Sequence, residues 1–412
     1  MLDPSGETTA AAAIGLSPAE AARTAAALAP FLPPALVALF NAGFIRSCVL
    51  YEEFIHRLAV GVVRGTGLEA ALREPGSAAE IARRAGLDAT RAEVPLGWML
   101  RHLAARRLLE PGDADDSTRR FRIRHALPEL DPGAVREAQQ RQDPSWLPSY
   151  TLAEAAAQHY PAFLRGEVAG EEILTSPARL RLWSDYFSND NGLYAVTNHV
   201  GAVAMAEWMP RGGGIVLELG GGLGSGAVAV LDRLARSGRL GEVHEYRFTE
   251  LVPALRRRGQ RALEARFPGA GFVSCGPLDM DRPFADQGTA PGSLAAVYAV
   301  NTLHVARDLR FTLAEIFRAL TPGGRLVLSE CVRPFPDQAV YVEFVFNLLE
   351  TFRAPRLDPP YRPNGGFLTP EQWAGALEAC GFADVRLLPN LAPIRDRFPA
   401  FYVAAIGATR PA

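Results

Sequence analysis

The stretch Ile215-Val-Leu-Glu-Leu-Gly-Gly-Gly-Leu-Gly-Ser-Gly226 joins an apolar run to a cluster of glycines. The run predicts a buried parallel strand, the glycines predict a tight turn, and residues 227–236 predict a helix. Together they indicate the first βα unit of a Rossmann-like α/β sheet. An acid precedes three glycines at alternate positions: Glu218, Gly220, Gly222 and Gly224. Glycine is needed where a ligand approaches the backbone and a Cβ would clash.

Other glycine motifs fit this turn less well. A strict dinucleotide fingerprint fails because Ser225 stands where its third glycine would fall, and only the weaker form with Ala227 fits. A lysine-dependent phosphate loop is excluded because the chain has no lysine. The acid and alternating glycines resemble motif I of class I S-adenosylmethionine (SAM) methyltransferases. The resemblance implies SAM as cofactor and S-adenosylhomocysteine (SAH) as product; the alternative is a glycine turn without a ligand.

Composition narrows the possible classes of protein. The 412 residues, 48% of them hydrophobic, suffice for two domains, and the net charge of -2 predicts no general attraction to nucleic acid or anionic membranes. The four scattered cysteines have no zinc-binding spacing, which predicts buried thiols, a reducing cytoplasm and no metal. No signal peptide and no long apolar span is recognisable, so we expect a cytoplasmic protein without membrane contact.

The predicted organisation has four parts. They are a flexible tail (1–30) leading into a helix from Pro18, a mainly helical, winged-helix-like dimerisation domain (31–127), a helical linker or lid (128–202), and a SAM-binding methyltransferase domain (203–412).

The second part carries the signals of two helices and a hairpin. Ser77 to Glu80 forms a capping box, residues 91–107 predict a second helix, and residues 108–112 and 119–124 predict a wing. This order resembles the winged-helix dimerisation domain of many small-molecule methyltransferases. The second helix is largely apolar, whereas helices that read DNA carry basic and amide side chains. We therefore expect a homodimer and no nucleic acid, although arginines in the wing keep a DNA-binding regulator as an alternative.

Aromatic side chains are dense between residues 128 and 202, which suits a lid or a pocket wall. Packing between domains is the alternative for any single ring. The candidate substrate-pocket residues are Tyr186, Tyr194, Asn198, His199, Phe344, Asn347 and Arg362.

Further strands are expected to supply the cofactor site. A strand over 245–250 ends in Glu250, whose carboxylate can accept hydrogen bonds from a ribose diol. Strands at 271–279 and 294–300 bring their own carboxyl ends to the same edge, and a fifth is expected at 325–330. The candidate cofactor-binding residues are Glu218, Gly220, Gly222, Gly224, Glu250, Leu251, Asp279, Met280 and Asn301.

A more specific resemblance covers roughly residues 190–405. The motifs that carry it are Tyr246-Arg-Phe-Thr-Glu-Leu251, Leu278-Asp-Met-Asp281, Asn301-Thr-Leu-His-Val-Ala-Arg-Asp-Leu-Arg310, Pro322-Gly-Gly324, Phe344-Val-Phe-Asn-Leu-Leu-Glu350 and Phe367-Leu-Thr-Pro-Glu-Gln-Trp373. They resemble the C-methyltransferase domains of polyketide synthases. In that family a histidine after the fourth strand works with a glutamate ending the fifth, which implies His304 and Glu330 here.

The pair suits the chemistry of carbon methylation. A carbon between two carbonyls must lose a proton before it attacks an electrophilic methyl, and an imidazole held by a carboxylate is a suitable base. Two departures from the family concern the acceptor region: Glu350-Thr-Phe352 replaces Gly-Trp-Trp, and Gly365-Gly-Phe367 replaces a segment with His-Pro. We therefore expect a small-molecule or carrier-bound acyl acceptor and favour carbon, with O-methylation of a phenol or enol as the alternative.

Overall fold

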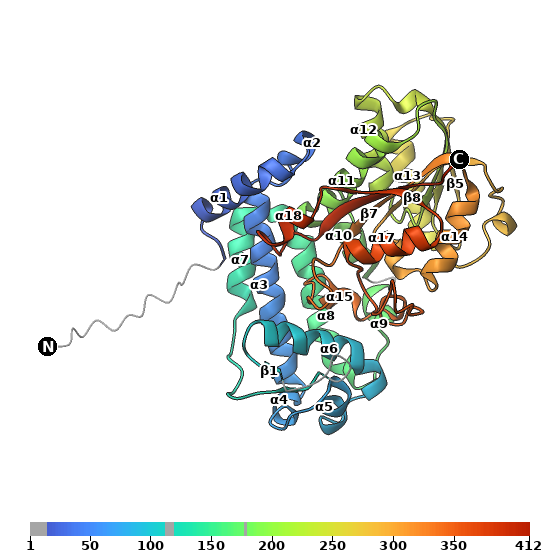
Figure 1. Cartoon of the computed structure of the whole chain (residues 1–412). Coiled ribbons are helices and arrows are strands. Elements are labelled where there is room, and N and C mark those ends of the chain that lie inside the picture. The colour runs from blue at the N-terminus through green and yellow to red at the C-terminus, as the bar shows by residue number, and fades with distance from the viewer. Residues whose placement is uncertain (1–14, 112–118, 177–178) are drawn as a thin grey trace.

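The computed structural model describes residues 15–111, 119–176 and 179–412 (Figure 1). Residues 1–14 of the expected tail, the tip of the expected wing (112–118) and residues 177–178 lie outside the described part. The helix expected from Pro18 is formed as α1 (Pro18–Leu28), inside the range 1–30 that was assigned to the tail. A capping box of Ser17 and Glu20 stabilises this helix locally. Tertiary packing also stabilises it, because Ala21 and Leu28 are fully buried.

A seven-stranded sheet forms the second half of the molecule. Its strand order is β5-β4-β3-β6-β7-β9-β8. The first five strands are parallel, and β9 runs antiparallel to both neighbours. The strands are β3 (Gly214–Leu219), β4 (Val243–Thr249), β5 (Val273–Gly276), β6 (Leu294–Val300), β7 (Leu320–Cys331), β8 (Ala383–Leu388) and β9 (Val403–Thr409). The Rossmann-like α/β class expected from the sequence is confirmed.

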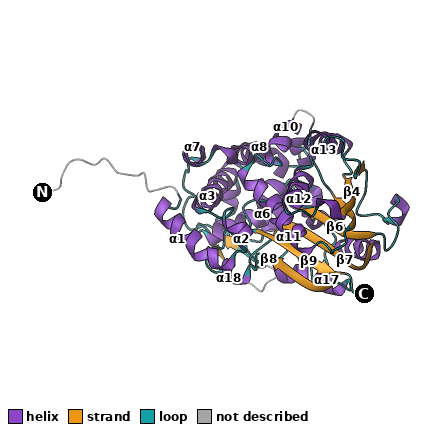
Figure 2. Ribbon diagram, turned by 90° about the horizontal axis from the view of Figure 1, so that it is seen from above, coloured by secondary structure: helices purple, strands orange, loops and turns teal. Residues whose placement is uncertain are grey.

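Helices cover both faces of this sheet (Figures 1 and 2). They are α11 (Gly192–Trp208), α12 (Ser225–Arg236), α13 (Pro253–Arg266), α14 (Leu309–Ala319) and α17 (Pro370–Ala379). Three short helices, α15 (Glu343–Phe346), α16 (Glu350–Arg353) and α18 (Ala392–Arg395), lie in the connections of the same part of the chain. Every residue of β6 is buried, as expected for a central parallel strand covered on both sides. The strand order reverses between β3 and β6, where open α/β sheets bind ligands at the carboxyl ends of the strands.

The first half is mainly helical, as expected. Its helices are α2 (Pro34–Val37), α3 (Ala42–Gly65), α4 (Leu68–Ala71), α5 (Ala78–Arg84), α6 (Ala89–Ala105), α7 (Pro132–Gln142), α8 (Leu147–Leu164), α9 (Gly170–Leu174) and α10 (Leu180–Tyr186). The capping box of Ser77 and Glu80 starts α5, and β1 (Glu110–Pro111) pairs antiparallel with β2 (Phe121–Arg122). Two helices followed by a hairpin are therefore present. The likeness to a winged helix, and the four-part division of the chain, stay predictions.

The two halves share one hydrophobic core. The indole nitrogen of Trp98, on α6, donates to the carbonyl of Val340 at 3.1 Å. The ring of Phe40 packs on that of Phe401 with centroids 4.4 Å apart. These contacts bury side chains of the first 100 residues against the carboxyl-terminal part of the chain, so the helical half helps to shape the sheet half.

Burial of α6 removes the argument for a dimer that its apolar sequence suggested. Leu96, Trp98, Met99, Leu100 and Leu103 are all buried within the chain itself. An apolar helix face that is already covered offers no interface to a second copy. The homodimer stays a prediction, and its interface would have to lie on a surface other than the apolar face of α6.

The arginines of the expected wing are engaged with carboxylates of the same chain. The pairs are Arg119 with Asp337, Arg120 with Glu80, and Arg122 and Arg124 with Glu110. Their charges are therefore partly neutralised within the chain. Among the described residues, no helix combines the length and apolarity needed to cross a membrane.

A matched pair of helical glycines tests how closely α11 lies on the sheet. A Cβ on Gly201 would stand 2.6 Å from the hydroxyl oxygen of Tyr298 on β6 and 2.7 Å from Ser329 Cβ on β7. Gly201→Ala should therefore destabilise the protein by about 1–3 kcal/mol. Gly61 in α3 is exposed with open space around it, so Gly61→Ala should be neutral or stabilising by up to about 1 kcal/mol. Thermal unfolding of both variants measures the contrast, and equal melting temperatures would contradict the close contact.

Candidate functional site

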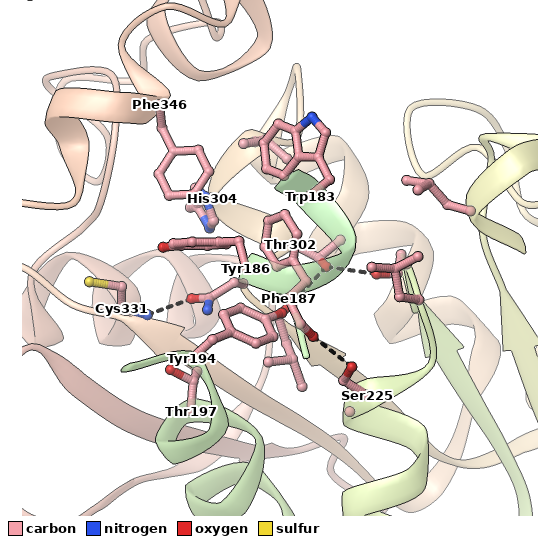
Figure 3. A pocket seen from close by; sticks show the side chains of 18 of the residues that line it. Trp183, Tyr186, Phe187, Tyr194, Thr197, Ser225, Thr302, His304, Cys331 and Phe346 are labelled. Atoms are coloured by element: carbon pink, nitrogen blue, oxygen red, sulfur yellow. Dashed lines mark hydrogen bonds between the residues drawn. The ribbon is translucent and has the colours of Figure 1, made fainter. Parts of the chain in front are cut away.

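A cavity of about 610 Å³ lies at the carboxyl ends of the parallel strands. One end is formed by the glycine turn after β3 and by Glu250 after β4. The other end is formed by aromatic side chains, several of them from α10 and α11 (Figure 3). His304 lines the same cavity. The cavity therefore joins the predicted cofactor site to the predicted base.

Glycine is required at positions 220, 222 and 224 for different physical reasons. All three have positive φ angles, at +60° for Gly220, +56° for Gly222 and +82° for Gly224. A Cβ on Gly220 would stand 2.5 Å from Thr302 Cγ2, and one on Gly224 would stand 3.0 Å from the backbone of Gly259. Nothing lies within 4 Å of the Cβ position of Gly222. Since Gly222 lines the cavity, the space beside it is the space that a bound cofactor would use.

Glu250 holds the glycine turn from the neighbouring strand. Its Oε2 accepts a hydrogen bond from the backbone N–H of Gly222 at 3.0 Å, and its Oε1 accepts one from Val252 at 2.7 Å. Each carboxylate oxygen can accept a second hydrogen bond. The side chain is thus fixed by backbone donors and still able to bind a ribose diol, as the sequence predicts.

Glu218 is a buried acid beneath the turn. Its side chain lines the cavity, only 1% of the residue is exposed, and its Oε2 has no hydrogen-bond partner. Burial raises the pKa of Glu218 to about 8, an effect that the hydroxyl of Tyr246 opposes and the charge of Glu250 reinforces. An unpartnered buried acceptor next to an open turn fits the positively charged amino-acid end of SAM.

The two residues predicted to form a catalytic pair lie in hydrogen-bond contact, and their catalytic role stays a prediction. His304 follows β6 and Glu330 ends β7, and His304 Nδ1 lies 2.7 Å from Glu330 Oε2. The other oxygen of Glu330 accepts the backbone N–H groups of Thr302 and Leu303 at 3.2 and 3.0 Å. Glu330 is fully buried. Because Nδ1 is engaged by the carboxylate, Nε2 is the ring nitrogen of His304 that is left to act on a substrate.

Two neighbours fix the backbone that carries this pair. Asn301 has a φ of +47°, and its Oδ1 accepts the backbone N–H of Cys331 at 2.8 Å. Arg362 is 1% exposed and donates to the carbonyl oxygens of His304 and Ala306, the latter at 2.7 Å. Burial lowers the pKa of Arg362 to about 10, which leaves the guanidinium charged at neutral pH. Arg362 therefore supports the histidine from behind and is not among the residues that line the cavity.

The acceptor end of the cavity is an aromatic chamber. Trp183 and Phe187 stack with centroids 4.9 Å apart and ring planes 11° apart, and Phe346 lies against Trp183 at 6.2 Å (Figure 3). Other side chains that line it are Tyr186, Tyr194, Tyr341, Phe352, Phe367 and Tyr402. Of the predicted pocket residues, Tyr186 and Tyr194 line the chamber.

The other predicted pocket residues lie outside the cavity lining. Phe344 is fully buried between Trp98 and Tyr160, and its neighbour Phe346 faces the cavity in its place. His199 is partly buried on α11, where burial and then the charge of Arg236 lower its pKa. Asn198 and Asn347 are buried amides. The family motif identified the segment around Phe344. The rotation of helix α15 in the fold decides which of its phenylalanines faces the chamber.

Four predicted cofactor residues also lie outside the lining. Gly224 caps α12, Leu251 is 54% exposed beside Glu250, and Asp279 and Met280 follow β5. Gln287 holds that last loop, because its side chain both accepts from the backbone N–H of Asp279 at 2.8 Å and donates to its carbonyl at 2.9 Å. Their roles toward an adenine stay predictions. Among the described residues, no three His, Cys, Asp or Glu side chains gather as metal ligands would.

Comparisons with known proteins agree with this geometry. Residues 221–328 match the family model described as a methyltransferase domain. The polyketide synthase ThaG of Burkholderia thailandensis is 31% identical over 322 residues, which cover 74% of this chain and 5% of ThaG. The reducing polyketide synthase Preu2 of Preussia isomera is 27% identical over 242 residues, which cover 58% of this chain and 10% of Preu2. The chain thus spans a small fraction of the length of these relatives.

Solved structures share the fold over most of the chain. The CurJ carbon methyltransferase superposes with a TM-score of 0.75 at 24% identity, covering 96% of this chain and 100% of that chain. The CMeT domain of the citrinin polyketide synthase gives 0.70 at 19% identity, covering 96% and 99%. The trans-methyltransferase CalH, in complex with SAH, gives 0.55 at 21% identity, covering 84% and 90%. This chain therefore carries a methyltransferase domain and has the class I SAM-dependent fold.

Two glycines with positive φ and open space test the cofactor site. Gly222→Val should abolish binding of SAH in calorimetry, because the branched side chain fills the space of the ligand. Gly238 follows α12 with a φ of +71° and nothing within 4 Å of its Cβ position, and it does not line the cavity. Gly238→Val carries a comparable backbone strain and should bind SAH like the wild type. Unchanged SAH affinity in Gly222→Val would contradict the assignment.

The raised pKa of Glu218 predicts a dependence of stability on pH. Between 4.5, the ordinary value, and about 8, the folded state holds a proton that the unfolded state lacks, so this carboxyl stabilises less as pH rises. Glu218→Gln should melt close to the wild type near pH 5 and above it near pH 9. Glu264→Gln, at an exposed acid on α13, should show the same difference from wild type at both pH values. A Glu218→Gln difference that does not grow with pH would contradict the burial effect.

Proposed function

We propose that this chain, through its class I methyltransferase domain, methylates an enolisable carbon of an acyl substrate with His304 as the base. The observation that carries the proposal is the His304–Glu330 pair, whose histidine lines the cavity that also contains the glycine turn. When bound, SAM supplies an electrophilic methyl group on a sulfonium. O-methylation and C-methylation differ in whether a carbon-bound proton must be removed, and a buried histidine with a carboxylate partner suits that removal.

The residues of the pair have separate tasks. His304 Nε2 takes the proton from the carbon between two carbonyls. Glu330 fixes the tautomer by accepting from Nδ1–H and stabilises the imidazolium that forms. The two backbone donors on Glu330 keep its carboxylate oriented toward the ring. The base adds roughly 10²–10⁴-fold in rate, and the remaining acceleration comes from holding the acceptor in line with the methyl group.

The residues that line the chamber favour an acceptor without a charge. The described residues that line the cavity include no arginine, and the chain has no lysine. Arg362, the guanidinium behind His304, is engaged with backbone carbonyls. A free carboxylate would therefore enter the chamber without a counter-charge. A thioester removes that charge, so we infer an acyl thioester, of the kind a carrier protein presents, as the acceptor.

The acetoacetyl thioester of N-acetylcysteamine tests the reaction. With SAM it should yield a product methylated at the carbon between the carbonyls, identified by mass spectrometry and NMR. His304→Ala should lower kcat by roughly 10²–10⁴-fold while leaving the Kd for SAH nearly unchanged. Glu330→Gln should also lower kcat, and the double variant should be little worse than His304→Ala, because the two residues act as a unit.

His199→Ala is the matched control, since His199 is a partly buried histidine outside the cavity lining. It should retain activity. An O-methylated enol as the main product, or near-normal turnover by His304→Ala, would overturn the proposal. Turnover of free acetoacetate at the rate of the thioester would overturn the inference of a neutral acceptor.

A further inference from the structure

The amino-terminal part of α13 has a basic face. Residues 251–263 contain four arginines and no acid, in a chain whose net charge is -2. Residues three and four apart lie on one side of a helix, so Arg257, Arg258 and Arg261 share a side. All three are exposed, whereas Leu263 on the opposite side is buried. These three arginines form what we call the α13 stripe.

The charges of the stripe are largely unmatched within the protein. Among the described residues, Arg257 and Arg261 have no hydrogen-bond or ion-pair partner. Arg258 donates to Ser184 Oγ on α10, which lies beside α13 (Figure 2). Like charges four residues apart on a helix destabilise it slightly, so α13 gains no stability from this arrangement. The unmatched charges favour a negatively charged partner from outside the chain.

The stripe borders the opening of the cavity. Thr175, Val252 and Thr351 line the cavity and are exposed, so the cavity opens between α9, α13 and α16. Val252 directly precedes α13 and is 48% exposed. Ala254 also lines the cavity, on the same side of α13 as the stripe and one turn before it. A partner held by the stripe would therefore lie beside the way into the aromatic chamber.

We propose that the α13 stripe docks the acidic face of a carrier protein that presents the acyl thioester on a phosphopantetheine arm. The proposal rests on the proposed function for the thioester, and it adds the surface that the carrier binds. Opposite charges across an interface speed the encounter and fix the orientation of the partners. With the carrier on the stripe, its arm enters the chamber through the adjoining opening.

Two other negatively charged partners fit the stripe less well. A single phosphate, such as that of the arm alone, needs a pocket, whereas the stripe is the exposed side of a helix and none of its residues lines the cavity. Nucleic acid is disfavoured by the net charge of -2. Both partners are outcomes of the test.

Three acetoacetyl thioesters of increasing size test the proposal. The acetoacetyl group is carried by N-acetylcysteamine, by phosphopantetheine, or by the arm of an acidic acyl carrier protein. Arg257→Glu/Arg261→Glu should raise the KM for the carrier-bound substrate about 10- to 100-fold and leave kcat unchanged. The kcat/KM for the two small thioesters should stay at the wild-type value. Arg258 is kept in this variant because it contacts α10.

Controls separate docking from damage to the fold. Arg257→Lys/Arg261→Lys keeps both charges and should bind the carrier nearly like the wild type. Arg236→Glu reverses an exposed charge at the end of α12 and should leave all three reactions unchanged. Raising the salt from about 0.05 to 0.5 M should raise the wild-type KM for the carrier-bound substrate alone, because salt screens exposed charges. This last measurement needs no variant, so it tests the proposal even if the double variant does not fold.

An unchanged KM for the carrier-bound substrate in Arg257→Glu/Arg261→Glu would overturn the proposal. A loss that already appears with the phosphopantetheine thioester would also overturn it, since the stripe would then bind the phosphate of the arm. The same holds for binding of duplex DNA that the double variant abolishes while the carrier-bound substrate reacts normally. If the wild type methylates none of the three thioesters, the proposed function fails. Calorimetric binding of the carrier to the wild type, lost in the double variant, would still support the stripe in that case.

Discussion

The buried carboxylate of Glu330 holds the centre of the site together. It ends β7, yet its hydrogen bonds reach the turn that follows β6, through two backbone N–H groups and the imidazole of His304. Because the group is fully buried, an unmatched charge there would be costly, and the three donors supply the compensation. One side chain thus fixes the relative position of two strand ends and the orientation of the base. Arg362 and Asn301 fix the same backbone from other directions.

The cavity has two chemically different ends. The cofactor end contains the acids Glu218 and Glu250 and backbone that comes close because of its glycines. At the other end aromatic side chains gather, and the cavity lining also includes aliphatic residues and threonines. The difference suits a charged ligand of fixed structure at one end and an uncharged, partly apolar group at the other. His304 lines the same cavity as both ends.

The helical half of the chain contributes to this site both directly and indirectly. Trp183 and Tyr186 on α10, with Phe187 just after it, form part of the aromatic wall. Trp98 on α6 donates to Val340, just before the α15 segment that brings Phe346 to the cavity. The oxygen Oγ of Ser225, at the start of α12, donates to the carbonyl of Phe187 at 2.6 Å. Changes in the helical half can therefore alter the aromatic chamber without touching His304 or Glu330.

The sequence by itself determined the five parallel strands, the glycine turn, the position of Glu250 and the pairing of His304 with Glu330, but not the two antiparallel strands β8 and β9. Parallel strands bring their carboxyl ends to one edge, so residues at those ends converge whatever the loops do. The limits of β6 and the capping box at Ser77 follow from local pattern in the same way. These features depend on the spacing of apolar residues along the chain and on whether a residue follows the end of a strand.

The tertiary structure alone decided which side chains face the cavity from irregular segments. Phe346 and not Phe344 enters the chamber, and Arg362 supports His304 from behind. The same holds for α6, whose apolar face is covered within the chain and not by a second copy. In short helices and loops, a small rotation of the backbone turns each side chain toward a different neighbour. That rotation is set by packing between segments far apart in the sequence, which no local pattern records.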